Sequence, residues 1–138
     1  MKLVLLPGMD GTGLMFRPFI DAAYNHSIDV ISYPNDTSQK YTELIGFVKD
    51  RLPSEVEFII IAESFSGPIA YALMKEVIPN LKAVIFVASF LENPRPILFS
   101  LIKLLPISLI FRLPIPKAVI RKYMLGTNAS DSLIAEFK

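Results

Sequence analysis

The sequence predicts an α/β fold, and two observations indicate it. Four short runs rich in aliphatic and aromatic residues, at residues 3–6, 29–33, 58–61 and 83–87, have the length of strands. Between them, apolar residues recur at helical spacing, so strands alternate with single amphipathic helices. Such alternation gives right-handed crossovers and a parallel sheet covered on both faces. We expect four parallel strands in the spatial order second, first, third, fourth.

The first strand, at residues 3–6, leads into a glycine-rich loop from Pro7 to Gly13. Apolar residues at helical spacing follow, with Pro18 suited to the first turn: Phe16, Phe19, Ile20 and Ala23. The glycines stand in the order G-x-x-G-x-G, and no acidic residue ends a following strand at the distance that a dinucleotide site requires. We interpret the loop as one whose backbone comes close to a ligand.

The second strand is predicted over residues 29–33 and is closed by Pro34 to Asp36. A helix is expected next, ending before Pro53. Its apolar face consists of Tyr41, Leu44, Ile45, Val48 and Leu52.

The third strand passes into a helix within a few residues. The run Phe58 to Ile61 is typical of a strand buried on both faces, because it is too short and too β-branched for a helix. Pro68 then suits the first turn of a helix. The apolar residues of this helix recur every four positions, at Ile69, Leu73 and Val77.

Ser64 stands at this bend. A serine on a sharp turn from strand to helix needs small residues two positions before and after it, because the backbone crowds itself there. Ala62 and Ser66 meet that need, and Gly67 adds slack. The pattern predicts a nucleophile elbow with Ser64 in a strained, positive-φ conformation. The alternative is a serine that merely caps the helix after a buried strand.

The fourth strand, at residues 83–87, is predicted to be buried, and the character of the chain then changes. Residues 94–116 hold five of the 11 prolines, and the apolar stretch at residues 97–105 is interrupted by Lys103 and is too short for a membrane span. Short helices broken by prolines suit a lid across the carboxyl ends of the strands, where open parallel sheets bind ligands. The alternative is a set of core-covering helices without a role in binding.

The end of the chain resembles the start of another helix. Gly126 is typical of a helix stop and Ser130 of a new N-cap, after which an apolar face begins. We therefore expect the natural protein to continue past Lys138; a short terminal helix is the plain alternative.

Composition excludes several classes of protein. The 138 residues are 52% hydrophobic and 20% charged, with a net charge of +1, which argues against disorder and against a nucleic-acid partner. There is no Cys and one His, so we expect neither disulfides nor a metal or other cofactor. The apolar run at residues 3–6 is too short for a signal peptide, so a cytoplasmic location is expected.

With the elbow, the glycine loop and the alternation of elements together, the chain resembles the α/β-hydrolase superfamily. In particular, Leu5 to Gly13 and Ala62 to Pro68 look like the matching motifs of small bacterial α/β-fold hydrolases of the esterase and lipase type. The resemblance implies a hydrolase core over residues 1–93, with lid or cap helices over residues 94–138 that form no separate domain. The sheet is incomplete relative to the family.

The resemblance also assigns residues by position. Ser64 would be the nucleophile, and the backbone N–H groups of Met9 and Phe65 would form the oxyanion hole. Gly8, which follows Pro7 where the family often has His-Gly, and Asp10 would contact the substrate.

The family's catalytic acid and histidine are missing from this chain. The single histidine, His26, precedes the second strand and is expected at the amino edge of the sheet, too far to reach Ser64. Glu63 is expected to point elsewhere on the tight turn. Glu92 stands where some lipase-like relatives have their acid, but it has no histidine to orient.

Two functions remain open at this stage. The first is a serine hydrolase that acts on apolar carboxylic esters or thioesters by acyl transfer through Ser64. The second is a non-catalytic or truncated hydrolase-like domain that binds a lipid or a protein partner. We also expect association into a dimer or larger assembly through the edge strand at residues 83–87 and the lid, because unpaired strand edges invite pairing. Attachment to a membrane surface is not expected.

Overall fold

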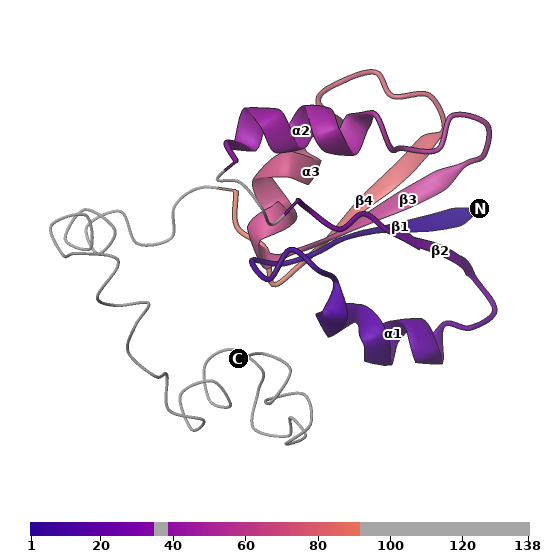
Figure 1. Ribbon diagram of the computed structural model, residues 1–138. Coiled ribbons are helices and arrows are strands. Elements are labelled where there is room, and N and C mark those ends of the chain that lie inside the picture. Colours follow the sequence, from indigo (N-terminus) through magenta and orange to yellow (C-terminus); the bar gives the residue numbers. More distant parts are fainter. Residues whose placement is uncertain (35–38, 92–138) are drawn as a thin grey trace, which may run out of the picture. The chain divides into compact units, whose positions relative to one another are not determined.

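In the computed structural model, residues 1–34 and 39–91 are described, and they belong to the first of the two units into which the chain divides, Met1–Pro94. They form a four-stranded sheet in the order β2-β1-β3-β4, with every pair parallel (Figure 1). The strands are β1 (Lys2–Leu6), β2 (Ser27–Val30), β3 (Phe58–Glu63) and β4 (Leu81–Val87). The predicted α/β class and strand order are confirmed.

Helices cover both faces of this sheet. A 3₁₀ turn, η1 (Leu14–Phe16), and α1 (Arg17–Ala22) lie on one face, whereas α2 (Tyr41–Lys49) and α3 (Gly67–Met74) lie on the other (Figure 1). A second 3₁₀ turn, η2 (Ser64–Ser66), joins β3 to α3. The expected lid over residues 94–138 lies outside the described residues.

Alternation along the two central strands divides the core into two clusters, because successive side chains of a strand point to opposite faces. Toward α2 and α3 lies the larger cluster, which contains Val4, Leu6, Leu44, Val48, Phe58, Ile60, Ile69 and Leu73. Toward α1 lies the smaller cluster of Leu5, Phe16 and Ile61. Strand β3 contributes buried residues to both clusters, which confirms that it is covered on both faces.

The second strand differs from its predicted range of 29–33. It begins at Ser27, which is paired with Lys2, and ends at Val30. The N–H of Ile31 still donates to the carbonyl of Leu5 in β1 at 3.0 Å, but the N–H of Tyr33 donates to the carbonyl of Gly11 at 2.7 Å, so at Tyr33 the chain is bonded to the glycine loop instead of a strand.

Both later helices are shorter than predicted. Helix α2 ends at Lys49, so Leu52 lies beyond it. Helix α3 starts at Gly67 and ends at Met74, because the chain must turn back through Asn80, at φ 67°, to enter β4. Val77, which the periodicity placed on the apolar face of α3, is therefore fully exposed.

Strand β4 confirms one expectation and departs from another: it is the expected edge strand, but it is not the buried strand that its composition predicted. Its burial pattern is mostly exposed, and Ile85, Phe86 and Val87 show 46%, 39% and 43% of their surface. Within residues 1–34 and 39–91, β3 is the one strand that pairs with it, so β4 is an edge of the sheet. No helix in the same residues is both long and apolar enough to cross a bilayer.

Candidate active site

Ser64 stands at the junction between β3 and the helix that follows. Its φ is 43°, a conformation that costs energy for any residue other than glycine. The residue opens the single turn η2, after which α3 begins at Gly67. Ala62 and Ser66, the small residues two positions before and after Ser64, are both completely buried. The predicted sharp turn and the positive φ at Ser64 are confirmed.

Position 67 has room only for glycine, because the chain that follows β4 passes close to it. Its φ and ψ are both −53°, which any residue adopts, so its backbone conformation does not demand glycine. A Cβ at this position would lie 2.4 Å from the carbonyl oxygen of Phe90 and 3.0 Å from Cβ of Ser89. The Ser89 hydroxyl also donates to the carbonyl of Ala62 at 2.8 Å, so this segment packs directly against the turn at Ser64.

The glycine loop after β1 is fixed by hydrogen bonds of its own. The N–H of Gly11 donates to the carbonyl of Gly8 at 3.1 Å, which closes a turn with Met9 at its tip. The Asp10 carboxylate accepts the N–H of Thr12 at 3.2 Å and also its hydroxyl, so Asp10 is engaged within the loop. Gly11 has a φ of 67°, which suits glycine.

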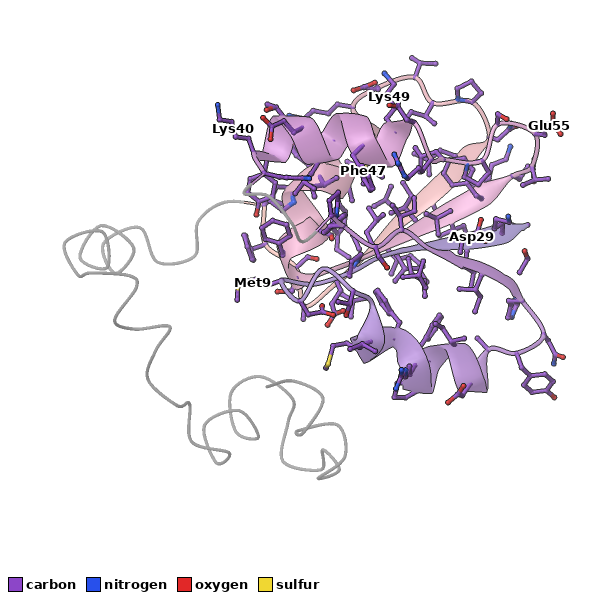
Figure 2. All side chains as sticks on the ribbon, in the orientation of Figure 1. Met9, Asp29, Lys40, Phe47, Lys49 and Glu55 are labelled. Atoms are coloured by element: carbon purple, nitrogen blue, oxygen red, sulfur yellow. The ribbon has the colours of Figure 1, made fainter. Side chains whose placement is uncertain are left out.

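The two loops meet at the carboxyl edge of the sheet. Leu6 of β1 is paired with Ala62 of β3, and Met9 and Phe65 each follow that pair by three positions. The hydroxyl of Ser66 donates to the carbonyl of Pro7, so the loops are in contact. The side chain of Met9 is 77% exposed, and Figure 2 shows it at the end of the sheet opposite Glu55.

Two backbone donors at this edge are unengaged. Among the described residues, the N–H groups of Met9 and Phe65 donate to no acceptor, whereas those of Gly11 and Thr12 do. They stand on the segments that follow two adjacent strands, β1 and β3, each three positions after the paired residues Leu6 and Ala62. An anionic oxygen bound beside Ser64 is the ligand that such donors suit.

Aromatic side chains surround the turn. The ring of Phe65 stacks on Tyr41 with 4.9 Å between centroids, and Tyr33 meets it edge to face at 6.1 Å. The Tyr41 hydroxyl donates to the carbonyl of Phe65 at 3.4 Å. Burial raises the pKa of Tyr33 to about 12, partly opposed by its hydrogen bond with Ser66, so this tyrosine is neutral near pH 7. The three rings therefore pack together around Phe65, the residue that follows Ser64.

Glu63 turns toward the glycine loop. Its carboxyl carbon lies 3.5 Å from where a Cβ on Gly8 would stand, so the carboxyl group lies beside the backbone of Gly8. Burial raises the pKa of this carboxyl, and the nearby charge of Asp10 raises it further. Its second oxygen, Oε2, is buried without a partner in the described part of the chain.

The histidine of this chain does not stand beside Ser64. His26 is exposed in the turn before β2, where its N–H donates to the carbonyl of Ala23 at 2.9 Å. Because Ser27 pairs with Lys2 and Lys2 with Phe58, this turn is at the amino edge, opposite the end where Ser64 stands. Glu92 lies outside the described residues. No group of three His, Asp or Glu side chains within residues 1–34 and 39–91 is arranged to hold a metal ion.

Sequence reasoning did not find three of the polar groups at this edge. The sequence indicated Ser66 only as a small residue, although its buried hydroxyl is hydrogen-bonded to both the carbonyl of Pro7 and the hydroxyl of Tyr33. Glu63 was set aside, and Tyr33 was assigned to a strand. The signal available was Ser66 itself, since a hydroxyl where only smallness is needed indicates a hydrogen bond.

Comparisons with protein-family models, with curated proteins and with solved structures gave no match for this chain.

Proposed function

We propose that this chain is a serine hydrolase of the α/β-hydrolase type that acts on carboxylic esters or thioesters by acyl transfer through Ser64. One observation carries the proposal: Ser64 has a φ of 43° at the turn from strand to helix, next to the unengaged N–H groups of Met9 and Phe65. A nucleophile and two donors for an oxyanion are the parts that acyl transfer needs at one place.

In the proposed reaction, the hydroxyl oxygen of Ser64 attacks the carbonyl carbon of the substrate. The carbonyl oxygen becomes negative and accepts hydrogen bonds from the N–H groups of Met9 and Phe65. The bond from the acyl carbon to the leaving oxygen or sulfur then breaks, and the proton lost by the Ser64 hydroxyl ends on the departing alcohol or thiol. Water next attacks the acyl carbon, the bond to Ser64 breaks, and one proton of the water returns to the serine oxygen, which frees the carboxylic acid. The stacked rings of Tyr41 and of Phe65, the residue after Ser64, support an apolar acyl group.

The serine also needs a base, since an unassisted hydroxyl is a weak nucleophile. His26 at the opposite edge of the sheet cannot serve. We therefore expect the 138-residue chain to acylate slowly and to turn over esters negligibly, whereas a longer form with an acid and a histidine would be active.

The proposal is tested by covalent labelling. A fluorophosphonate, which phosphonylates nucleophilic serines, is incubated with the chain at high concentration for hours, and the adduct is mapped by mass spectrometry. We expect one adduct, at Ser64, which is lost in Ser64→Ala and kept in Ser54→Ala, a change at an exposed serine of the amino edge. Labelling spread equally over several serines, or none at Ser64, would contradict the proposal.

A second candidate function is a hydrolase-like domain that binds a lipid or protein partner. The observation that favours it is the exposed apolar edge strand β4, with Ile85, Phe86 and Val87 between 39% and 46% exposed. The same labelling separates the two functions, because a purely binding domain has no reason to activate Ser64.

A further inference from the structure

Tyr33 is bonded to both loops of the candidate site, although it belongs to neither of them. Its backbone N–H donates to the carbonyl of Gly11 at 2.7 Å, in the loop after β1. Its hydroxyl is hydrogen-bonded to the hydroxyl of Ser66, in the turn after β3. Its ring meets the ring of Phe65 edge to face, with 6.1 Å between the centroids. One residue after β2 therefore contacts the two segments that carry the unengaged N–H groups.

The hydrogen bonds through Ser66 have one possible direction. A carbonyl oxygen only accepts, so the single hydroxyl hydrogen of Ser66 must be donated to the carbonyl of Pro7. The Ser66 oxygen then accepts from Tyr33, whose hydroxyl is the donor. Burial raises the pKa of Tyr33 to about 12, so this donor keeps its hydrogen near pH 7. Tyr33, Ser66 and Pro7 therefore form a directed chain of hydrogen bonds that joins the segments after three strands.

The glycine loop is held on both sides of Met9. The carbonyl of Pro7, two residues before Met9, accepts the hydroxyl hydrogen of Ser66. The carbonyl of Gly11, two residues after Met9, accepts the N–H of Tyr33. Only three residues separate these two anchors, and a backbone hydrogen bond within them closes the turn. The direction of the Met9 N–H therefore depends on both anchors, and Tyr33 takes part in each.

The same bonds link the two backbone donors to each other. Ser66 directly follows Phe65, so its hydrogen bond to Pro7 connects the two donor segments in one step. Tyr33 acts on both sides of that link, because its hydroxyl fixes Ser66 and its N–H fixes the loop of Met9. An oxyanion requires both donors within hydrogen-bond distance of one oxygen, so a small change in their separation weakens one of the two bonds.

Packing alone does not explain the two hydroxyls. Ser66 is completely buried, and alanine would be small enough for the same position. Phenylalanine in place of Tyr33 would keep the ring that meets Phe65. Because a buried hydroxyl is unfavourable unless it is hydrogen-bonded, the pair is better explained by the carbonyl of Pro7 that it holds.

We propose that Tyr33 is a positioning residue, which holds the loop of Met9 and the turn of Phe65 at the separation that a single oxyanion requires. The inference rests on the proposed function, because the two N–H groups share an oxyanion only if Ser64 is the nucleophile. In this role Tyr33 acts through the two loops and does not contact the substrate. Its hold on the loops can be measured without any reaction.

The experiment compares the ¹⁵N-labelled full chain with Tyr33→Phe, which removes one hydroxyl and keeps both the ring and the backbone N–H. Tyr24→Phe is the matched control, because Tyr24 is 80% exposed in the turn after α1. We expect the amide signals of Met9 and Phe65 to shift in Tyr33→Phe and to stay in place in Tyr24→Phe. The amide of residue 33 should still exchange slowly with solvent in Tyr33→Phe, because its bond to Gly11 is kept.

The second readout is the phosphonylation of Ser64, separated into reagent binding and the rate of the bound step. Tyr33→Phe should slow the bound step by about 10-fold, less than the loss of a whole oxyanion donor, and should leave reagent binding unchanged. Ser66→Ala removes the next hydroxyl of the same chain of bonds. Adding Tyr33→Phe to Ser66→Ala should cause no further slowing, since both residues act through the same bonds.

The outcomes separate this inference from the proposed function. Unchanged Met9 and Phe65 signals in Tyr33→Phe would overturn the inference. So would shifted signals with an unchanged bound step, or a loss of reagent binding alone, which would make Tyr33 a substrate contact. In these cases a labelled Ser64 leaves the proposed function standing. If Ser64 of the original chain is never labelled, the proposed function fails and the role of Tyr33 in the reaction fails with it, while the amide signals still decide whether Tyr33 holds the two loops.

Discussion

Replacing Gly67 by alanine tests how closely the chain after β4 packs on the turn at Ser64. The added Cβ would lie 2.4 Å from the carbonyl oxygen of Phe90, whereas such contacts start at about 3.3 Å. The carbonyl must therefore move by about 0.9 Å, the difference between these two distances. That movement also disturbs the 2.8 Å hydrogen bond from Ser89 to Ala62.

The magnitude follows from three effects. Overpacking costs about 1–3 kcal/mol, and loss of the Ser89 hydrogen bond costs about 1 kcal/mol. Alanine regains at most about 1 kcal/mol over glycine in a helix. We therefore expect Gly67→Ala to lower the free energy of unfolding by about 1–3 kcal/mol.

Gly46 provides the matched control, because it lies inside α2 and a Cβ there would meet nothing within 4 Å. The same substitution, Gly46→Ala, should raise the free energy of unfolding by about 0.5–1 kcal/mol. Urea unfolding followed by circular dichroism measures both. A Gly67→Ala chain as stable as the original, with an unchanged dependence on urea, would refute the close packing described for Phe90.

Three further predictions concern charge, association and turnover. Because burial and Asp10 raise the pKa of Glu63, the folded chain holds this proton more tightly than the unfolded chain, so the carboxyl's destabilising effect grows as pH rises through the raised value. Urea unfolding should accordingly show Glu63→Gln gaining stability relative to the original chain between pH 4 and pH 7; a constant difference would argue against a buried carboxyl. Light scattering across a concentration series should show a dimer or larger assembly that Ile85→Lys on β4 weakens, and a clean monomer at high concentration would exclude association. Steady-state hydrolysis of p-nitrophenyl butyrate should not exceed that of Ser64→Ala, and turnover that depends on Ser64 would show that a base is present after all.

Local sequence patterns predicted the parts of this fold that depend on neighbouring residues. The run Phe58 to Ile61 is β-branched and apolar, and it is a strand buried on both faces. The small residues around Ser64 predicted the positive φ, because crowding at the turn is set by residues two positions away. Parallel order followed from the alternation of strands and helices.

Contacts between distant residues were not predictable in the same way. Ser66 bonds Pro7 across 59 positions and Tyr33 across 33, and no periodicity reports such pairs. For β4 the edge position was predicted correctly, whereas the burial was predicted wrongly from composition, because Leu81 to Val87 have the composition of a central strand. The composition of a segment indicates that it forms a strand, whereas the burial of that strand depends on its position in the sheet.

The account's central claim is that Ser64 and the N–H groups of Met9 and Phe65 act on one reacting group. The most direct test is the ¹⁵N–¹H spectrum of the chain before and after phosphonylation at Ser64. The account predicts that the amide protons of Met9 and Phe65 move downfield in the adduct, because they now donate to a phosphonyl oxygen, while that of Gly11 in the same loop does not. An adduct at Ser64 that leaves the Met9 and Phe65 signals in place would contradict it.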